Sequence, residues 1–84
     1  MPTATEGVSP ARDTVLALLA QRAPGKTICP SEVARVLAGG GDWRAAMPAV
    51  HDAVDTLLGE GRVALSWKGR MLAAQAGPYR IRRA

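Results

Sequence analysis

The chain has 84 residues, a length that suits one small domain. Hydrophobic residues make up 48% of it, enough for a core, but 16 of them are alanine, which favours closely packed helices over a bulky core. The single cysteine excludes an internal disulfide, and no apolar run is long enough to cross a membrane. We therefore expect a cytoplasmic protein without a membrane partner.

The net charge of +4 is unevenly distributed. Residues 1–60 carry five cationic and seven acidic side chains, a net charge of −2. Residues 61–84 carry six cationic side chains and no acidic one. The positive charge therefore belongs to the C-terminal part of the chain, not to the segments before it.

The N-terminal part predicts a tail followed by a helix. Residues 1–8 lack apolar periodicity, so we expect a flexible tail before one domain at 9–84. Ser9 is predicted to cap the first helix, with Pro10 at its first position. This helix is expected to run to about Arg22, and Ala23-Pro24-Gly25 ends it.

A short extended segment at 26–29 is predicted to precede the second helix. Pro30 suits a first helical position, and the charge of Glu32 then suits the positive end of the helix dipole. The three glycines at 39–41 break this helix, and Asp42 is expected to cap the next one.

Residues 42–61 carry the clearest helical pattern. With Val50 at the centre of one face, an apolar stripe at 3.6 residues per turn contains Trp43, Ala46, Met47, Ala53, Val54, Leu57 and Leu58. The opposite face carries Arg44, Ala45, Pro48, His51, Asp52, Asp55 and Thr56. Because proline disrupts a helix interior, we favour a separate turn at 43–47 with the main helix starting at Pro48. One helix kinked at Pro48 is the alternative.

From Arg62 the apolar period changes from 3.6 to 2, which indicates strands. Segments near 62–67 and 78–82 are predicted to pair as an antiparallel ribbon, with the loop between them, residues 68–77, forming a wing. Lys68-Gly69-Arg70 is a turn signal within this loop. Together the elements predict an α+β fold, a winged helix-turn-helix with three helices and a small antiparallel β-ribbon.

The segments KTICPSEVARVL, DWRAAMPAV and LLGEGRV, with a KGR turn and a closing PYRIRR, carry a family resemblance. They resemble a small bacterial family of winged-helix domains, domain of unknown function 3253, over roughly residues 13–83. The resemblance implies a winged-helix fold. It implies no activity, cofactor or catalytic residue.

Two residues carry the reactive groups that an enzyme would need, Cys29 and His51. A helix N-terminus could lower the pKa of Cys29, but free cysteine is usually a buried apolar residue. His51 has no evident orienting partner for a nucleophile–base pair, and two ligands do not make a zinc site. We therefore expect no enzyme activity, no cofactor and no metal. A thiol-based redox role would rest on Cys29 alone.

Duplex DNA binding is the sharper hypothesis, because a helix-turn-helix offers the outer face of its third helix to the major groove. That face holds Arg44 and His51, but also Asp52 and Asp55, whose charge opposes phosphate. The C-terminal ribbon is free of acids, and its candidate backbone contacts are Lys68, Arg70, Arg80 and Arg82. We expect the wing to lead any contact, with steep salt dependence.

Alternatives remain for each part of this surface. The basic ribbon can be a solvated edge that keeps the domain soluble. The whole domain can be a protein–protein interaction module that does not bind DNA, with an acidic helix face beside a basic ribbon. Trp43 shares the face of Val50 and is expected in the core, whereas Trp67 either packs beneath the wing or stacks on a nucleotide. The sequence gives no sign of a small-molecule ligand.

Overall fold

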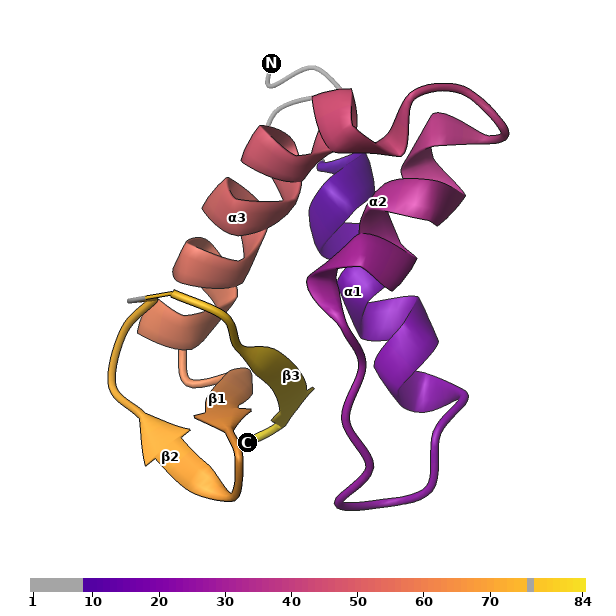
Figure 1. The fold of residues 1–84 in the computed structure, drawn as a ribbon. Helices are drawn as coiled ribbons and strands as arrows, with labels where there is room; N and C mark the ends of the chain where they lie inside the picture. Colours follow the sequence, from indigo (N-terminus) through magenta and orange to yellow (C-terminus); the bar gives the residue numbers. More distant parts are fainter. Residues whose placement is uncertain (1–8, 76) are drawn as a thin grey trace, which may run out of the picture.

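The computed structural model describes residues 9–75 and 77–84. It contains three helices followed by three strands (Figure 1): α1 Pro10–Ala20, α2 Pro30–Ala38, α3 Trp43–Gly59, β1 Val63–Trp67, β2 Arg70–Leu72 and β3 Arg80–Arg83. The predicted tail at 1–8 lies outside the described residues. No helix in the described ranges is both long and apolar enough to span a membrane.

The helices begin at the residues that the sequence indicates. The Ser9 hydroxyl and the Asp42 carboxylate each accept a hydrogen bond, 3.1 Å long, from a backbone N–H of the first turn of α1 and α3. Pro10 and Pro30 occupy first helical positions. The carboxylate of Glu32 instead reaches back to the N-cap of α2, where it accepts from the backbone N–H of Cys29 at 3.2 Å. These contacts satisfy N–H groups that have no partner within the helix.

The third helix is continuous through Pro48, so the two-part interpretation is wrong. Pro48 is exposed, and its ring removes only the hydrogen bond to the carbonyl of Arg44, also an exposed residue, where water can substitute. Met47 packs against the core and Val50 is fully buried in it. Packing on one face therefore keeps the two sides of Pro48 in one helix.

The sheet has strand order β2-β1-β3, and both pairings are antiparallel. The predicted ribbon is confirmed as the β1–β3 pair, with Leu65 opposite Ile81. The wing, in contrast, contains the additional strand β2, which the sequence did not predict. Lys68 and Gly69 connect β1 to β2 with φ angles of 51° and 80°. Two consecutive positive φ angles in a two-residue connection are typical of a type I′ hairpin, which suits the twist of the flanking strands.

The predicted extended segment at 26–29 contributes one isolated bridge to the other edge of the sheet. The backbone N–H of Ile28 donates to the carbonyl of Ile81 at 2.8 Å, and the reverse bond measures 2.9 Å. Strand β3 therefore lies between β1 and this segment. The pairing attaches the sheet to the loop that joins α1 and α2.

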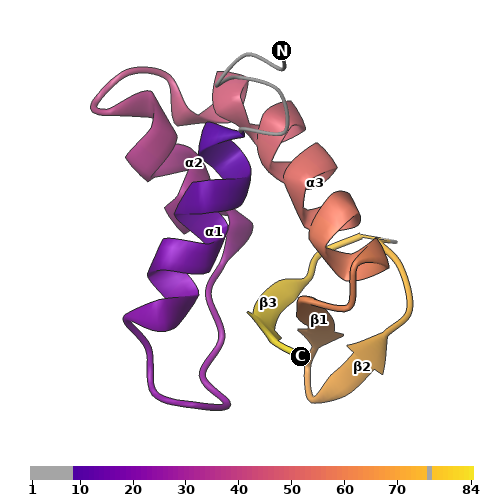
Figure 2. The same ribbon diagram turned by 180° about the vertical axis from the view of Figure 1, so that it is seen from behind.

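A single apolar cluster joins the helices to the sheet. In Figures 1 and 2, α1 and α2 lie side by side, α3 runs obliquely beside them, and the sheet lies at the C-terminal end of α3. The fully or nearly buried members of the cluster are Val15, Leu19, Ile28, Val33, Ala34, Val50, Val54, Leu57, Val63, Leu65, Tyr79 and Ile81. Both predicted periodicities, 3.6 in α3 and 2 in the strands, are confirmed by this list. The α+β fold is compatible with the expected winged-helix arrangement.

Candidate nucleic-acid interface

The tip of the β1–β2 hairpin carries two free cations. Lys68 and Arg70 flank Gly69, and both are exposed. In the part of the chain that the structure describes, neither side chain has a hydrogen-bond or ion-pair partner. The two ion pairs in that part join Arg12 to Glu60 and Arg22 to Glu32. The carboxylates of the helices therefore do not neutralise the tip.

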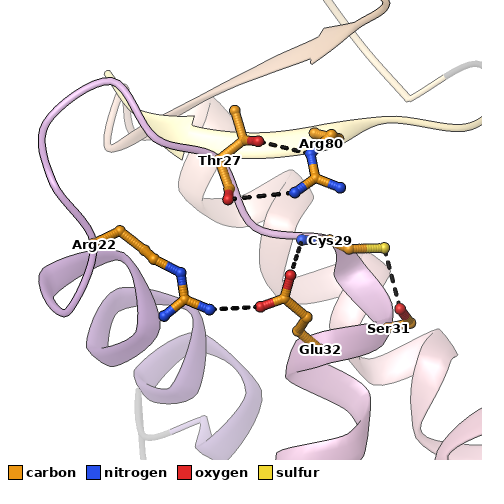
Figure 3. A network of polar contacts seen from close by, with 6 residues as sticks. All are labelled: Arg22, Thr27, Cys29, Ser31, Glu32 and Arg80. Carbon is orange, nitrogen blue, oxygen red and sulfur yellow. Dashed lines mark hydrogen bonds and ion pairs between the residues drawn. The ribbon is translucent and has the colours of Figure 1, made fainter.

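Arg80 is engaged inside the molecule. Its Nε donates to the Thr27 hydroxyl at 2.6 Å, and a terminal nitrogen lies 3.4 Å from the Thr27 carbonyl oxygen (Figure 3). The side chain is half-buried. Arg80 thus fastens β3 to the α1–α2 connection, and binding a phosphate with the same nitrogens would disrupt that contact.

Arg82 lies on the same face of β3 as Arg80, because residues two apart in a strand point the same way. Its cross-strand neighbour on β1 is Ala64. The Nε atom of Arg82 is shielded from solvent and has no hydrogen-bond partner among residues 9–75 and 77–84. The adjacent Arg83 donates to the backbone carbonyl of Arg22 at 3.1 Å. The strand arginines are therefore more constrained than the two cations at the tip.

Arg44 lies away from the wing, at the opposite end of α3 from the sheet (Figure 1). It is exposed, and its guanidinium carbon lies 4.5 Å from the ring centroid of Trp43. Trp43 itself is half-buried and packs against the core, as predicted. Asp52 and Asp55 are exposed on the outer face of α3, which keeps that face acidic.

His51 lies partly buried against the segment that precedes β3. Its Nδ1 is 2.6 Å from the hydroxyl of Tyr79, and the two ring centroids are 5.6 Å apart. The backbone carbonyl of His51 accepts a hydrogen bond from the Gln75 amide at 2.9 Å, and the same amide nitrogen contacts Asp55. These bonds hold the segment before β3 against α3. His51 was predicted as a nucleic-acid contact only because it lies on the outer face of its helix. Its hydrogen bond to Tyr79, 28 residues away, could not be predicted, because nothing in the sequence near either residue indicates it.

Titration of Tyr79 should make the protein sensitive to alkali. Burial raises the pKa of the Tyr79 phenol well above its ordinary value, and negative charge at Asp55 and Cys29 adds to the shift. Since the folded pKa is raised, the stabilisation is complete below the unfolded value of about 10 and is lost as the pH rises above it. We expect the free energy of unfolding to fall by up to about 1.4 kcal/mol per pH unit there.

Tyr79 is the only tyrosine in the chain, so the absorbance of its phenolate at alkaline pH reports this group alone. We expect the phenolate signal to rise together with the loss of circular dichroism. The Y79F variant should show a flatter dependence of unfolding free energy on pH above 10. Ionisation of the phenol at its ordinary pKa in the folded protein would contradict the prediction.

A mainly apolar groove lies between α2 and α3, with a volume of about 310 Å³. Its walls are Cys29–Ser31 at the start of α2, Trp43, Met47 and His51 on α3, and Trp67 and Gly77–Tyr79 from the sheet region. The thiol of Cys29 lies 3.1 Å from the Ser31 hydroxyl, whereas His51 bonds to Tyr79. The two candidate reactive groups thus share a groove but have different hydrogen-bond partners.

A model of the family described as "Protein of unknown function (DUF3253)" matches residues 9–84. No curated protein matches the chain.

Proposed function

The chain belongs to this family of unknown function, and from the geometry of its residues we propose that it is a cytoplasmic winged-helix protein that binds duplex DNA through its wing. The contacts are mainly to the phosphate backbone, as a regulator of transcription would use for its initial binding. The proposal is for a binding protein, not for an enzyme.

The observation that carries this proposal is the pair of free, exposed cations at the hairpin tip, Lys68 and Arg70. Cations bind phosphates by releasing counterions, so they must be accessible and must not be neutralised within the protein. A two-residue hairpin holds the backbone of both residues, which reduces the conformational entropy lost on binding. Arg82, on the outer face of the adjoining sheet, adds positive charge without a carboxylate beside it.

The outer face of α3 has a secondary role in this proposal. The exposed carboxylates of Asp52 and Asp55 repel phosphates, and Arg44 lies at the far end of the helix. A recognition helix placed fully in a major groove would bring both carboxylates close to the DNA backbone. Contacts led by the wing avoid that cost, although Asp52 can still accept a hydrogen bond from cytosine.

A double substitution at the tip tests the proposal. K68N/R70Q removes both charges, and asparagine at position 68 tolerates the positive φ of 51° that the hairpin requires. We expect duplex affinity at low salt to fall by at least about tenfold. The slope of log affinity against log salt should decrease by about 2, roughly one per lost phosphate contact. Fluorescence anisotropy with a random-sequence duplex at several salt concentrations measures both quantities.

The matched control is R12Q/R35Q, which removes the same charge from α1 and α2. Because Arg12 is paired with Glu60 and neither residue is at the tip, we expect less than about a threefold change in affinity. Equal losses in the two variants would mean that only net charge matters. A flat salt response, or full affinity in K68N/R70Q, would contradict DNA binding and favour the protein-interaction alternative.

A further inference from the structure

We propose that the groove between α2 and α3 binds a small planar aromatic anion, such as an aromatic carboxylate or sulfonate. Binding at this groove does not require DNA binding, although Lys68 takes part in both proposals. It rests on the aromatic walls of the groove, on the cations beside its two tryptophans, and on its size.

All three aromatic residues of the chain line this one groove. The sequence contains two tryptophans, one tyrosine and no phenylalanine, and Trp43, Trp67 and Tyr79 are all among the walls. Tyr79 belongs to the core, but Trp67 remains 38% exposed at the end of β1. A large aromatic side chain left open beside two others provides a surface on which a flat ring can stack. The apolar walls therefore favour an aromatic ligand over a sugar or a metal complex.

Three cations lie beside the two tryptophans of the groove, although none of the three is itself a wall residue. The guanidinium carbons of Arg35 and Arg44 lie 4.9 and 4.5 Å from the ring centroid of Trp43. The Lys68 ammonium lies 6.0 Å from that of Trp67. No carboxylate is among the residues that line the groove. The charged groups next to the walls are thus complementary to an anion.

The carboxylates of Glu32 on α2 and Asp55 on α3 have other partners. Glu32 accepts from the Cys29 backbone and pairs with Arg22 at 2.8 Å, on the side of α2 that faces α1 (Figure 3). Asp55 accepts from the Gln75 amide. Neither carboxylate is directed into the groove, so neither opposes an anionic ligand there.

The size of the groove fits a molecule of two or three rings. Its volume of about 310 Å³ lies at the lower end of the range for small-molecule pockets. Trp43 and His51 are eight residues apart on α3, a rise of about 12 Å. A short wall of this kind would hold only a few residues of a peptide. The side chains of Ser31 and His51 provide polar groups in the walls that can orient polar atoms of the ligand.

Two fluorescent probes that share a ring system test the proposal. The anionic probe is 1-anilinonaphthalene-8-sulfonate, and the neutral probe is N-phenyl-1-naphthylamine, which lacks the sulfonate. We expect the anion to bind the folded protein at one saturable site, with a dissociation constant on the order of tens of micromolar. The neutral probe should bind at least about fivefold more weakly.

Substitutions separate the walls from the charges. R44Q/K68Q should lower the affinity for the anionic probe about five- to tenfold and leave the affinity for the neutral probe unchanged. S31F is designed to fill the groove and should abolish binding of both probes. The matched control is A20F, beside a different hollow between α1 and the C-terminal residues, and it should leave both affinities unchanged.

Protection of Cys29 provides a readout that needs no substitution. Because Cys29 is the only cysteine and lines the groove, its alkylation by N-ethylmaleimide reports occupancy of this site alone. Saturating 1-anilinonaphthalene-8-sulfonate should slow the alkylation at least about fivefold, and this result decides the matter if S31F fails to fold. Equal affinity for the two probes, unsaturable binding, or unchanged alkylation would each overturn the proposal.

Discussion

Replacing Leu65 with alanine is expected to lower the free energy of unfolding by about 2 to 5 kcal/mol. Leu65 is fully buried at the centre of β1, where its cross-strand neighbours are Leu72 on β2 and Ile81 on β3. Truncation removes apolar contacts and leaves a cavity that the surrounding strands cannot fully close. A domain of this size has a total stability of only about 5 to 15 kcal/mol, so the loss is a large part of it.

Urea denaturation followed by circular dichroism measures this effect. The matched control is M71A on the neighbouring strand, because Met71 is 59% exposed and leaves no cavity. We expect less than about 0.5 kcal/mol of change in the control. If L65A and M71A lost the same stability, Leu65 would not lie at the centre of the core.

The strands that the sequence predicted are those with one buried face. Val63 and Leu65 alternate with less buried residues in β1, and Tyr79 and Ile81 do the same around β3, so a period of 2 was visible in each segment. Strand β2 has no such pattern, because Arg70 and Met71 are both exposed. It is an edge strand held mainly by backbone hydrogen bonds to β1. Such bonds do not require an alternation of polar and apolar side chains, so the sequence does not indicate the strand.

The candidate site was predictable in its charge but not in its contacts. Counting charged residues placed the cations in the C-terminal part, and the tip residues Lys68 and Arg70 are indeed free and exposed. Arg80 carries the same charge, yet its guanidinium bonds to Thr27, a residue 53 positions away. The fold alone determines which cations have such a partner, so composition overstates the charge available to a ligand.

The groove shows the same distinction for aromatic residues. The sequence predicted Trp43 in the core and left two roles open for Trp67, but Trp43, Trp67 and Tyr79 come from three distant segments. Their convergence depends on how the sheet packs at the end of α3, beside the start of α2. A small-molecule site could therefore not be predicted from the sequence, because the sequence does not show which of these residues lie together in the fold.

Replacing Pro48 with alanine is expected to raise the free energy of unfolding by about 2 kcal/mol. Proline in a helix interior costs about 3 kcal/mol relative to alanine, because a hydrogen bond is lost and the ring crowds the carbonyl of Arg44. Up to about 1 kcal/mol of the gain is offset, since alanine makes the unfolded chain more flexible. For a domain of this size the melting temperature should rise by about 8 to 16 °C, which thermal circular dichroism measures.

The matched control is P10A, at the first position of α1, where proline causes no lost hydrogen bond. Both prolines are exposed, so the two substitutions change the unfolded chain alike and differ only in the helix. We expect P10A to be neutral or slightly destabilising. A gain in P48A alone would mean that packing of Met47 and Val50 keeps α3 continuous against a local preference to break. No gain in P48A would mean that the helix adapts to Pro48 without strain, and the backbone cost assigned to it would be wrong.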